Sequence, residues 1–309
     1  MRIAVIGLGG VGGYYGGKLA KFYQEHDFME IIFIARGKHL EKIKEKGLKL
    51  ITSDEGEFIA KPHIAIEDPS SSGLFDIILF CTKSYDLEES AKLIKKNIGE
   101  DTVAVSLLNG VDNPGKISSA YPDLTVLNGC VYVSAFIEEP GIVRQPSGPG
   151  LLFFGDEKGE FKDWQGIEMV FKDAGIKCQY REDIKNVVWE KYIFICPLAS
   201  VTSFTGKSFG EVIDNRESQN LLEGLLHELC SIAESQGIAL PANFQKTLFE
   251  KIKSFPRDTK SSMQLDFERR NKTEIETFTG YVVKHAKKNQ IEVPLHQMVY
   301  SELSKRKIG

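Results

Sequence analysis

A glycine-rich turn directly after the first apolar run constrains the fold of this chain most strongly. Residues 1–6 read MRIAVI, a run typical of a buried strand, and GLGGVG at residues 7–12 fits the pattern G-x-G-x-x-G. In that pattern the first glycine permits a tight turn, the second leaves room where a pyrophosphate approaches, and the third lets the next helix pack close to the strand. An apolar stripe through Leu19, Ala20 and Phe22 predicts that helix. Strand, loop and helix together predict a dinucleotide-binding β-α-β unit.

Apolar strands continue to alternate with helical patterns through the first half of the chain. Such alternation predicts a parallel sheet that helices cover on both faces. The strands are predicted at residues 30–35, 48–51, 58–66, 76–82 and 102–108, and the helices at residues 38–46 and 87–98. The polar segment SDEG at residues 53–56 separates two of these strands and predicts a hairpin or two short strands there.

The pattern changes after residue 124. Residues 124–155 are rich in β-branched residues, glycine and proline, and they predict antiparallel strands with PSGPG as a loop. A helix at 161–174 and a strand at 176–180 follow, and from about residue 183 the pattern is helical, at 183–201, 220–236 with Gly237 as its stop, 273–289 and 295–305. Thr273 and Glu276 predict a T-x-x-E capping box for the third of these helices.

Length and pattern together predict two domains, because 309 residues are many for one core. The predicted fold class is α/β. An N-terminal Rossmann-type doubly wound sheet with added antiparallel strands spans residues 1–182, and an all-α C-terminal domain spans residues 183–309.

Charge and composition argue against several functional classes. A net charge of −4 without a basic stripe argues against a nucleic-acid partner. We expect no membrane span, since no apolar run approaches ~20 residues, and no signal peptide. The five cysteines contain no C-x-x-C pair and the histidines no metal spacing, so we expect buried thiols and no metal site. A cytoplasmic monomer or homodimer fits these observations.

The residue after the second strand bears on the cofactor. A site for NAD places Asp or Glu there to accept from the ribose 2′-hydroxyl, whereas this chain has Arg36 within Ala35-Arg36-Gly37-Lys38. A guanidinium can bind a 2′-phosphate through two hydrogen bonds, and Lys38 adds charge. The sequence therefore predicts NADP(H), with an ordinary surface arginine as the alternative.

Polar residues at predicted strand ends and on one apolar helix are candidates for the chemistry. Lys83 and Asn109 follow two neighbouring apolar strands, at the edge where open α/β sheets bind ligands. A solvated loop lysine and a turn-forming Asn-Gly are the alternatives. Lys191 interrupts a nearly all-apolar helix, where it either pairs with a carboxylate or acts as a general acid. Glu274 lies where a helix is predicted to start, and Ser262 lies in a segment that Asp258 or Thr259 could cap.

These residues together resemble the ketopantoate reductases (2-dehydropantoate 2-reductases) over nearly the whole chain. The matching motifs are GLGGVGGYYG at 7–16, Ala35-Arg36-Gly37, Cys81-Thr82-Lys83-Ser84, Asn109-Gly110, Trp189-Glu190-Lys191, Ser261-Ser262-Met263 and Lys272-Thr273-Glu274-Ile275. The last two, with the helix pattern that follows them, are the most specific.

The resemblance implies roles for the candidate residues. It implies that Lys191 is the general acid that protonates the ketone oxygen, that Glu274 holds substrate hydroxyl groups and that Ser262 contacts the substrate carboxylate. Asn109 then bridges cofactor and substrate, and Lys83 lies beside the nicotinamide or the substrate. The catalytic residues are thus Lys191 and Glu274, and substrate binding adds Asn109 and Ser262. The expected cofactor-binding residues are Gly7, Leu8, Gly9, Gly10, Val11, Gly12, Arg36, Lys83 and Asn109.

The chain also departs from the family pattern. Where the family usually carries three asparagines after its lysine, the ungapped positions here are Ile195, Ala199 and Phe209. The resemblance favours NADPH-dependent reduction of ketopantoate, a small-molecule 2-oxo acid, to pantoate in pantothenate and coenzyme A synthesis. The apolar positions favour a related reductase of a more apolar 2-oxo acid, and a non-catalytic NADP(H)-binding sensor is a third alternative. For an enzyme we expect the two domains to close on the substrate.

Overall fold

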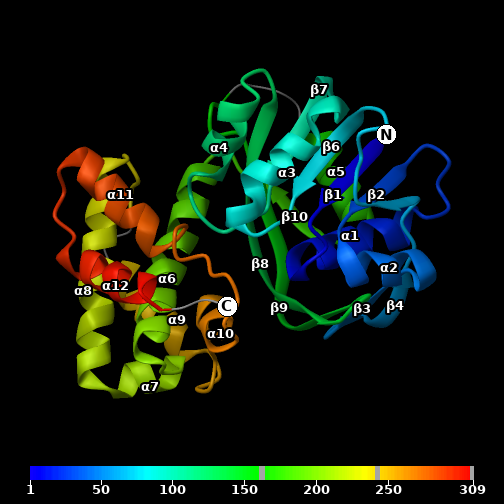
Figure 1. Cartoon of the computed structure of the whole chain (residues 1–309). Coiled ribbons are helices and arrows are strands. Elements are labelled where there is room, and N and C mark those ends of the chain that lie inside the picture. The colour runs from blue at the N-terminus through cyan, green and yellow to red at the C-terminus, as the bar shows by residue number, and fades with distance from the viewer. Residues whose placement is uncertain (160–163, 241–243, 307–309) are drawn as a thin grey trace. The chain divides into compact units, whose positions relative to one another are not determined.

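The first strand of the chain lies inside a ten-stranded sheet in the computed structural model (Figure 1). The structure describes residues 1–159, 164–240 and 244–306. The strands are β1 (Arg2–Ile6), β2 (Glu30–Ile34), β3 (Leu48–Thr52), β4 (Gly56–Ala60), β5 (Ile64–Ile66), β6 (Phe75–Phe80), β7 (Ile98–Ser106), β8 (Thr125–Glu139), β9 (Ile142–Gly155) and β10 (Lys177–Tyr180). They belong to the first of two compact units, Met1–Lys185 and Asn186–Gly309.

The strand order is β4-β3-β9-β8-β7-β6-β1-β2-β5, with β10 pairing with β9. From β5 to β8 every pairing is parallel, whereas β8 runs antiparallel to β9, and β3 runs antiparallel to β4. The predicted doubly wound sheet with added antiparallel strands is confirmed. Because β6 and β2 flank β1, the segments after all three strands emerge at one edge of the sheet.

Helices cover both faces of this sheet, because successive apolar side chains of β1 point to opposite faces and both sets are buried. Ile3 and Val5 pack into a core with α1 and α5, while Ala4 and Ile6 pack into a second core with α3 and α4. The helices of this unit are α1 (Gly10–Tyr23), α2 (Gly37–Lys46), α3 (Leu87–Leu93), α4 (Asn113–Ala120) and α5 (Gln165–Asp173). A continuous apolar strand is therefore buried on two sides.

Several local predictions in the first unit were wrong. The PSGPG segment is not a loop but lies inside β9, and the chain turns instead between β8 and β9 at Gly141, where φ is +85°. Residues 58–66 divide into the end of β4 and a separate strand, β5, which pairs with β2 at the far edge of the sheet. Phe22 of α1 is 42% exposed and does not join the buried stripe. Residues 161–163, in the predicted helix 161–174, lie outside the described residues.

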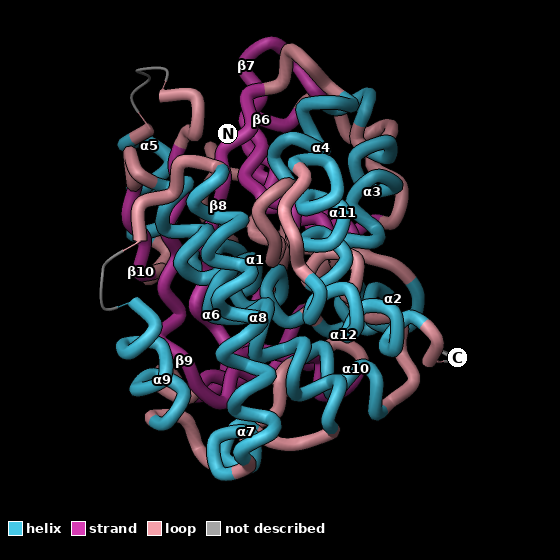
Figure 2. The backbone as a smooth tube through the Cα atoms, turned by 90° about the vertical axis from the view of Figure 1, so that its left-hand side faces the viewer, coloured by secondary structure: helices cyan, strands magenta, loops and turns pink. Residues whose placement is uncertain are grey.

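The second unit is helical, as expected. Its helices are α6 (Ile184–Thr205), α7 (Phe209–Asp214), α8 (Arg216–Ser235), α9 (Phe244–Lys253), α10 (Ser262–Glu268), α11 (Thr279–Asn289) and α12 (Pro294–Ser304), seen from a second side in Figure 2. Among the described residues, α6 is the one helix whose length and composition would suit a membrane span, with a mean hydropathy of 1.2 over its most apolar window. Of that window 72% is buried, as in the core helix of a soluble protein.

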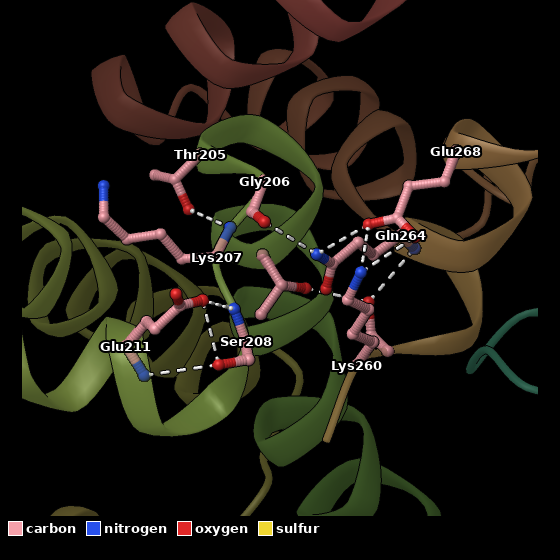
Figure 3. Close-up of polar contacts among 10 residues, drawn as sticks. Thr205, Gly206, Lys207, Ser208, Glu211, Lys260, Gln264 and Glu268 are labelled. Carbon is pink, nitrogen blue, oxygen red and sulfur yellow. Dashed lines mark hydrogen bonds and ion pairs between the residues drawn. The ribbon is translucent and has the colours of Figure 1, made fainter. Parts of the chain in front are cut away.

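The predicted capping box at Thr273 and Glu276 is wrong. The helix begins only at Thr279, and the Glu276 carboxylate instead accepts hydrogen bonds from Tyr300 and Lys284. A capping box does occur at Ser208 and Glu211, at the start of α7 (Figure 3). The T-x-x-E pattern failed because tertiary contacts hold residues 275–278 in turns before the helix starts.

A buried hydrogen-bonded pair, Glu228 and His296, fixes the start of α12 against α8. The Glu228 carboxylate accepts hydrogen bonds from the backbone N–H groups of Leu295 and His296 at 2.8 and 2.9 Å, and it lies 2.7 Å from the His296 ring. Burial alone would raise the pKa of Glu228, but these hydrogen bonds outweigh it and lower the pKa. Burial lowers the pKa of His296 in spite of the neighbouring carboxylate.

These shifts predict a pH-dependent stability. Below pH 6.5 the unfolded chain binds a proton at His296 that the folded chain does not, so the free energy of unfolding falls as the pH is lowered from 7 to 5. His296→Asn retains an N–H donor for Glu228 without titrating, so this fall should be smaller in the variant by urea unfolding. The exposed His227→Asn is the control, and equal pH dependence in all three proteins would contradict the prediction.

Candidate active site

The glycine loop brings α1 into direct contact with the ends of β1 and β6. Gly7 has φ +87°, and a side chain there would also meet the Thr82 backbone at 2.9 Å. A Cβ at Gly12 would overlap the carbonyl oxygen of Gly7 and lie 2.9 Å from the Cys81 Cβ. The loop can therefore close only with glycine at these two positions, as the sequence pattern predicted.

Gly9 differs from its neighbours because it faces open space. It is the N-cap of α1, with φ −68° and ψ −157°, and no heavy atom lies within 4 Å of a Cβ built there. The first turn of α1 carries no acidic residue, so its N–H groups and the positive end of the helix dipole are available to an anion. The loop fits the pyrophosphate of a dinucleotide, for which Gly9 leaves the room. Leu8 is buried and Val11 partly buried beneath it.

Arg36 follows β2 and is the N-cap of α2, ahead of Gly37, whose φ is +61°. Its side chain is 67% exposed, and one guanidinium nitrogen lies 3.2 Å from a carboxylate oxygen of Asp86. Lys38 is also exposed in this segment. A positively charged side chain thus lies after the strand next to β1, the position from which dinucleotide-binding sheets contact the adenosine ribose.

Lys83 and Asn109 end the neighbouring strands on the other side of β1. Lys83 is partly buried and precedes a 3-10 turn, Ser84–Asp86, after β6. Asn109 follows β7, and its carbonyl accepts a hydrogen bond of 2.9 Å from the Asn113 side chain, which ties the loop to α4. Gly110 continues the turn with φ +110°. Both predicted residues therefore lie at the carboxyl ends of parallel strands.

Lys191 lies on α6 between the exposed Glu190 and the buried Tyr192, and it is itself partly buried. The next residue, Tyr192, is buried, and its hydroxyl lies 2.8 and 2.9 Å from the carbonyl oxygens of Thr277 and Phe278. This contact anchors the turn before α11 on α6, one residue from Lys191. Further along, the Ser200 and Thr279 hydroxyls are 2.9 Å apart and fasten the start of α11 to the same helix.

Glu274 is not in the first turn of a helix, contrary to expectation. It precedes the turn that Tyr192 anchors, and its carbonyl oxygen accepts hydrogen bonds from the N–H groups of Thr277 and Phe278. The residue is 4% exposed, so a carboxylate is held in the interior of the second unit, on a segment that α6 positions.

Ser262 is exposed at the first position of α10, and Ser261 rather than Asp258 or Thr259 caps this helix. The Ser261 hydroxyl accepts a hydrogen bond from the Gln264 N–H and lies 2.8 Å from the Thr202 hydroxyl on α6. Gln264 also donates to the Gly206 carbonyl at the end of α6, and Lys260 pairs with Glu268 (Figure 3). This network fixes α10 to α6, the helix that carries Lys191.

The three apolar positions at which the family usually has asparagine lie in different surroundings. Ile195 is partly exposed, one turn beyond Lys191 on the same face of α6. Ala199 is 1% exposed, and Phe209 is 7% exposed at the start of α7, with its ring packed edge-on against Phe255. Only Ile195 of the three retains appreciable exposed surface.

The sequence interpretation missed two residues that contact candidate residues or their segments, one in each unit. Asp86 pairs with Arg36, which lies 50 residues earlier in the chain. Tyr192 donates a hydrogen bond to Thr277, which lies 85 residues later and follows Glu274 closely. Both contacts depend on which strands and helices become neighbours, and a local pattern carries no such signal. Tyr192 could have been noticed as a polar hydroxyl beside Lys191 in an apolar helix.

Two family models match the chain. The model described as ketopantoate reductase PanE/ApbA matches residues 3–159, and the one described as ketopantoate reductase PanE/ApbA C terminal matches residues 183–307. The chain belongs to this family. It is therefore an oxidoreductase of a family that uses NAD(P).

Full-length relatives agree with this membership. The chain is 32% identical to a 2-dehydropantoate 2-reductase from Porphyromonas gingivalis W83, whose crystal structure it matches over 99% of each chain with a TM-score of 0.84. It is 25% identical to the uncharacterized oxidoreductase YkpB of Bacillus subtilis (strain 168), over 98% of each chain. It shares its fold, at 20% identity and a TM-score of 0.86, with a D-mandelate dehydrogenase solved with NADH and anilino(oxo)acetate, covering 99% of this chain and 98% of that one.

The surroundings of Gly12 and Gly9 predict that alanine at Gly12 lowers stability, whereas alanine at Gly9 weakens dinucleotide binding. Gly12→Ala should lower the free energy of unfolding by about 1–3 kcal/mol, because its Cβ overlaps the Gly7 carbonyl. Gly9→Ala should change it by less than about 0.5 kcal/mol, because the space is open, yet weaken dinucleotide binding at least tenfold. Urea unfolding and cofactor fluorescence measure the two effects. Unweakened binding by Gly9→Ala would show that no ligand approaches this glycine.

Proposed function

We propose that this protein reduces a 2-oxo acid to a 2-hydroxy acid with NADPH, with 2-dehydropantoate as the first candidate substrate. The observation that carries the proposal is the arrangement on α6. A partly buried lysine, Lys191, adjoins the tyrosine that anchors the segment of the buried carboxylate Glu274. A general acid and a hydroxyl-binding carboxylate are the two groups that reduction of a hydroxylated 2-oxo acid needs.

In this proposal Lys191 donates a proton to the ketone oxygen as the carbonyl carbon is reduced. Its ammonium also stabilises the negative charge that develops on that oxygen. Glu274 accepts a hydrogen bond from a substrate hydroxyl, and the exposed Ser262 donates one to the substrate carboxylate. The nicotinamide supplies the hydride when the cofactor is bound. Asn109 and Lys83 hold cofactor and substrate at the ends of β7 and β6.

The cofactor and the cellular role are also part of the proposal. Arg36 and Lys38 favour a 2′-phosphate, hence NADP(H), and the glycine loop binds the pyrophosphate. Residues 1–182 then form the cofactor-binding domain, and residues 183–309 the substrate domain. With 2-dehydropantoate as substrate, the enzyme acts in pantothenate and coenzyme A synthesis in the cytoplasm.

Removal of the general acid tests this mechanism. Lys191→Ala should lower kcat about 10²–10⁴-fold with 2-dehydropantoate and leave NADPH binding within about twofold of wild type, because the lysine acts on the substrate oxygen. Lys191→Arg keeps the charge but should remain slow, since a guanidinium is a poor proton donor. Lys185→Ala, at an exposed position of α6, is the control. Full turnover by Lys191→Ala would remove this residue from the chemistry.

A second candidate substrate, a more apolar 2-oxo acid, is favoured by Ile195. This partly exposed isoleucine shares a helix face with Lys191 and offers no hydrogen bond to a substrate hydroxyl. An unpaired polar group costs roughly 1–3 kcal/mol, so a hydroxylated substrate would be disfavoured.

Substitution of Ile195 distinguishes the two substrates. If the pocket favours apolar acids, wild type should reduce 4-methyl-2-oxopentanoate more efficiently than 2-dehydropantoate, and Ile195→Asn should shift the ratio of kcat/KM toward 2-dehydropantoate by about tenfold or more. Ile195→Val, which stays apolar, should leave the ratio nearly unchanged. Efficient turnover of 2-dehydropantoate by wild type, with no shift in Ile195→Asn, would favour the first candidate.

A further inference from the structure

The Arg36–Asp86 ion pair joins the two segments that follow the neighbours of β1. Arg36 comes two residues after the end of β2, and Asp86 comes six residues after the end of β6. Since β2 and β6 flank β1, the pair lies at the sheet edge from which the glycine loop emerges. The guanidinium proposed to bind a 2′-phosphate therefore already has a carboxylate partner 3.2 Å away.

Local structure does not account for the position of this carboxylate. Asp86 is the N-cap residue of α3, a position at which an aspartate normally accepts a hydrogen bond from its own helix, yet its side chain makes no capping bond. The Arg36 side chain is 67% exposed and the Asp86 side chain 25%. An ion pair this exposed adds little to stability, so a ligand can displace it at small cost.

The two common cofactors place opposite demands on this pair. A 2′-phosphate, with about two negative charges, needs the guanidinium and is repelled by a carboxylate a few ångströms away. An unphosphorylated ribose presents a 2′-hydroxyl, which a carboxylate at this edge of a Rossmann-type sheet accepts as a hydrogen bond. Arg36 and Asp86 thus supply one group suited to each cofactor.

We propose that Asp86 sets the cofactor preference of this protein: it opposes binding of the 2′-phosphate at Arg36 and accepts the ribose 2′-hydroxyl of NADH. The inference rests on the proposed binding of a nicotinamide cofactor at the glycine loop and Arg36. Wild type then binds NADH within about tenfold of NADPH, because the carboxylate offsets part of the attraction of Arg36 for the phosphate.

Asp86→Asn is the decisive variant, because it removes the charge and keeps the shape. The ratio of NADPH to NADH affinity, measured by cofactor fluorescence without substrate, should rise about tenfold, and the ratio of kcat/KM should follow it. Glu89→Gln removes an exposed charge from the same helix and should change the ratio less than twofold. In an Arg36→Ala background Asp86→Asn should change the ratio of affinities less, because the carboxylate and the 2′-phosphate no longer compete for a guanidinium.

The outcomes separate this inference from the proposed function. The inference is supported if Asp86→Asn binds NADPH more tightly and NADH more weakly than wild type, while Glu89→Gln keeps the wild-type ratio of affinities. An unchanged ratio in Asp86→Asn, or a shift toward NADH, would overturn it while leaving the proposed reductase in place. Failure of wild type to bind either cofactor would overturn the proposed function itself.

Discussion

The close approach of α1 to the ends of β1 and β6 is the contact on which the rest of the first unit depends. The backbones meet because Gly7 takes a positive φ and Gly12 has no side chain to hold the helix away from Gly7 and Cys81. This approach buries α1 on one face of the sheet and leaves its N-terminus open beside Gly9. One packing requirement thus produces both a core and an open helix N-terminus. The strand order places the loops after β2 and β6 on either side of this open helix N-terminus.

Much of the first unit could be predicted because each buried strand can be recognised from its own local sequence. Strands covered on both faces are continuously apolar, and glycine turns and helix patterns separate them. The prediction failed where the pairing of strands, rather than the local amino-acid composition, determines the structure. PSGPG at residues 146–150 has the composition of a loop, yet β9 continues through it because β8 supplies a long antiparallel partner. Likewise, β5 leaves the hairpin region for the far edge of the sheet, beside β2, a choice of neighbour that no local periodicity encodes.

The second unit shows the same division between local and tertiary information. The apolar helix around Lys191 was evident from composition, and the structure gives it a single span, α6, through Pro197. The surroundings of Glu274 were not evident, because Thr273 and Glu276 imitate a helix start. The helix starts only at Thr279, where the chain is held by hydrogen bonds with Tyr192 and Ser200, which lie some 80 residues earlier in the chain. The three candidate residues Lys191, Ser262 and Glu274 come from separate segments. Lys191 lies on α6, and contacts with α6 position the other two segments.

The charged pair at the sheet edge shows how a single-residue rule can mislead about a site. An arginine after the second strand indicates a phosphate partner, but its free energy of interaction with that partner depends on every charge around it. Asp86 lies 3.2 Å from the Arg36 guanidinium, well within the screening length of ~8 Å at physiological salt, so its charge acts on an anion that the arginine binds. Because Asp86 comes from the loop after β6, the sheet order and not the motif brings it there. If Asp86 acts as proposed, cofactor choice is a property of the two loops after β2 and β6, and a substitution in either loop would alter it without changing the glycine loop.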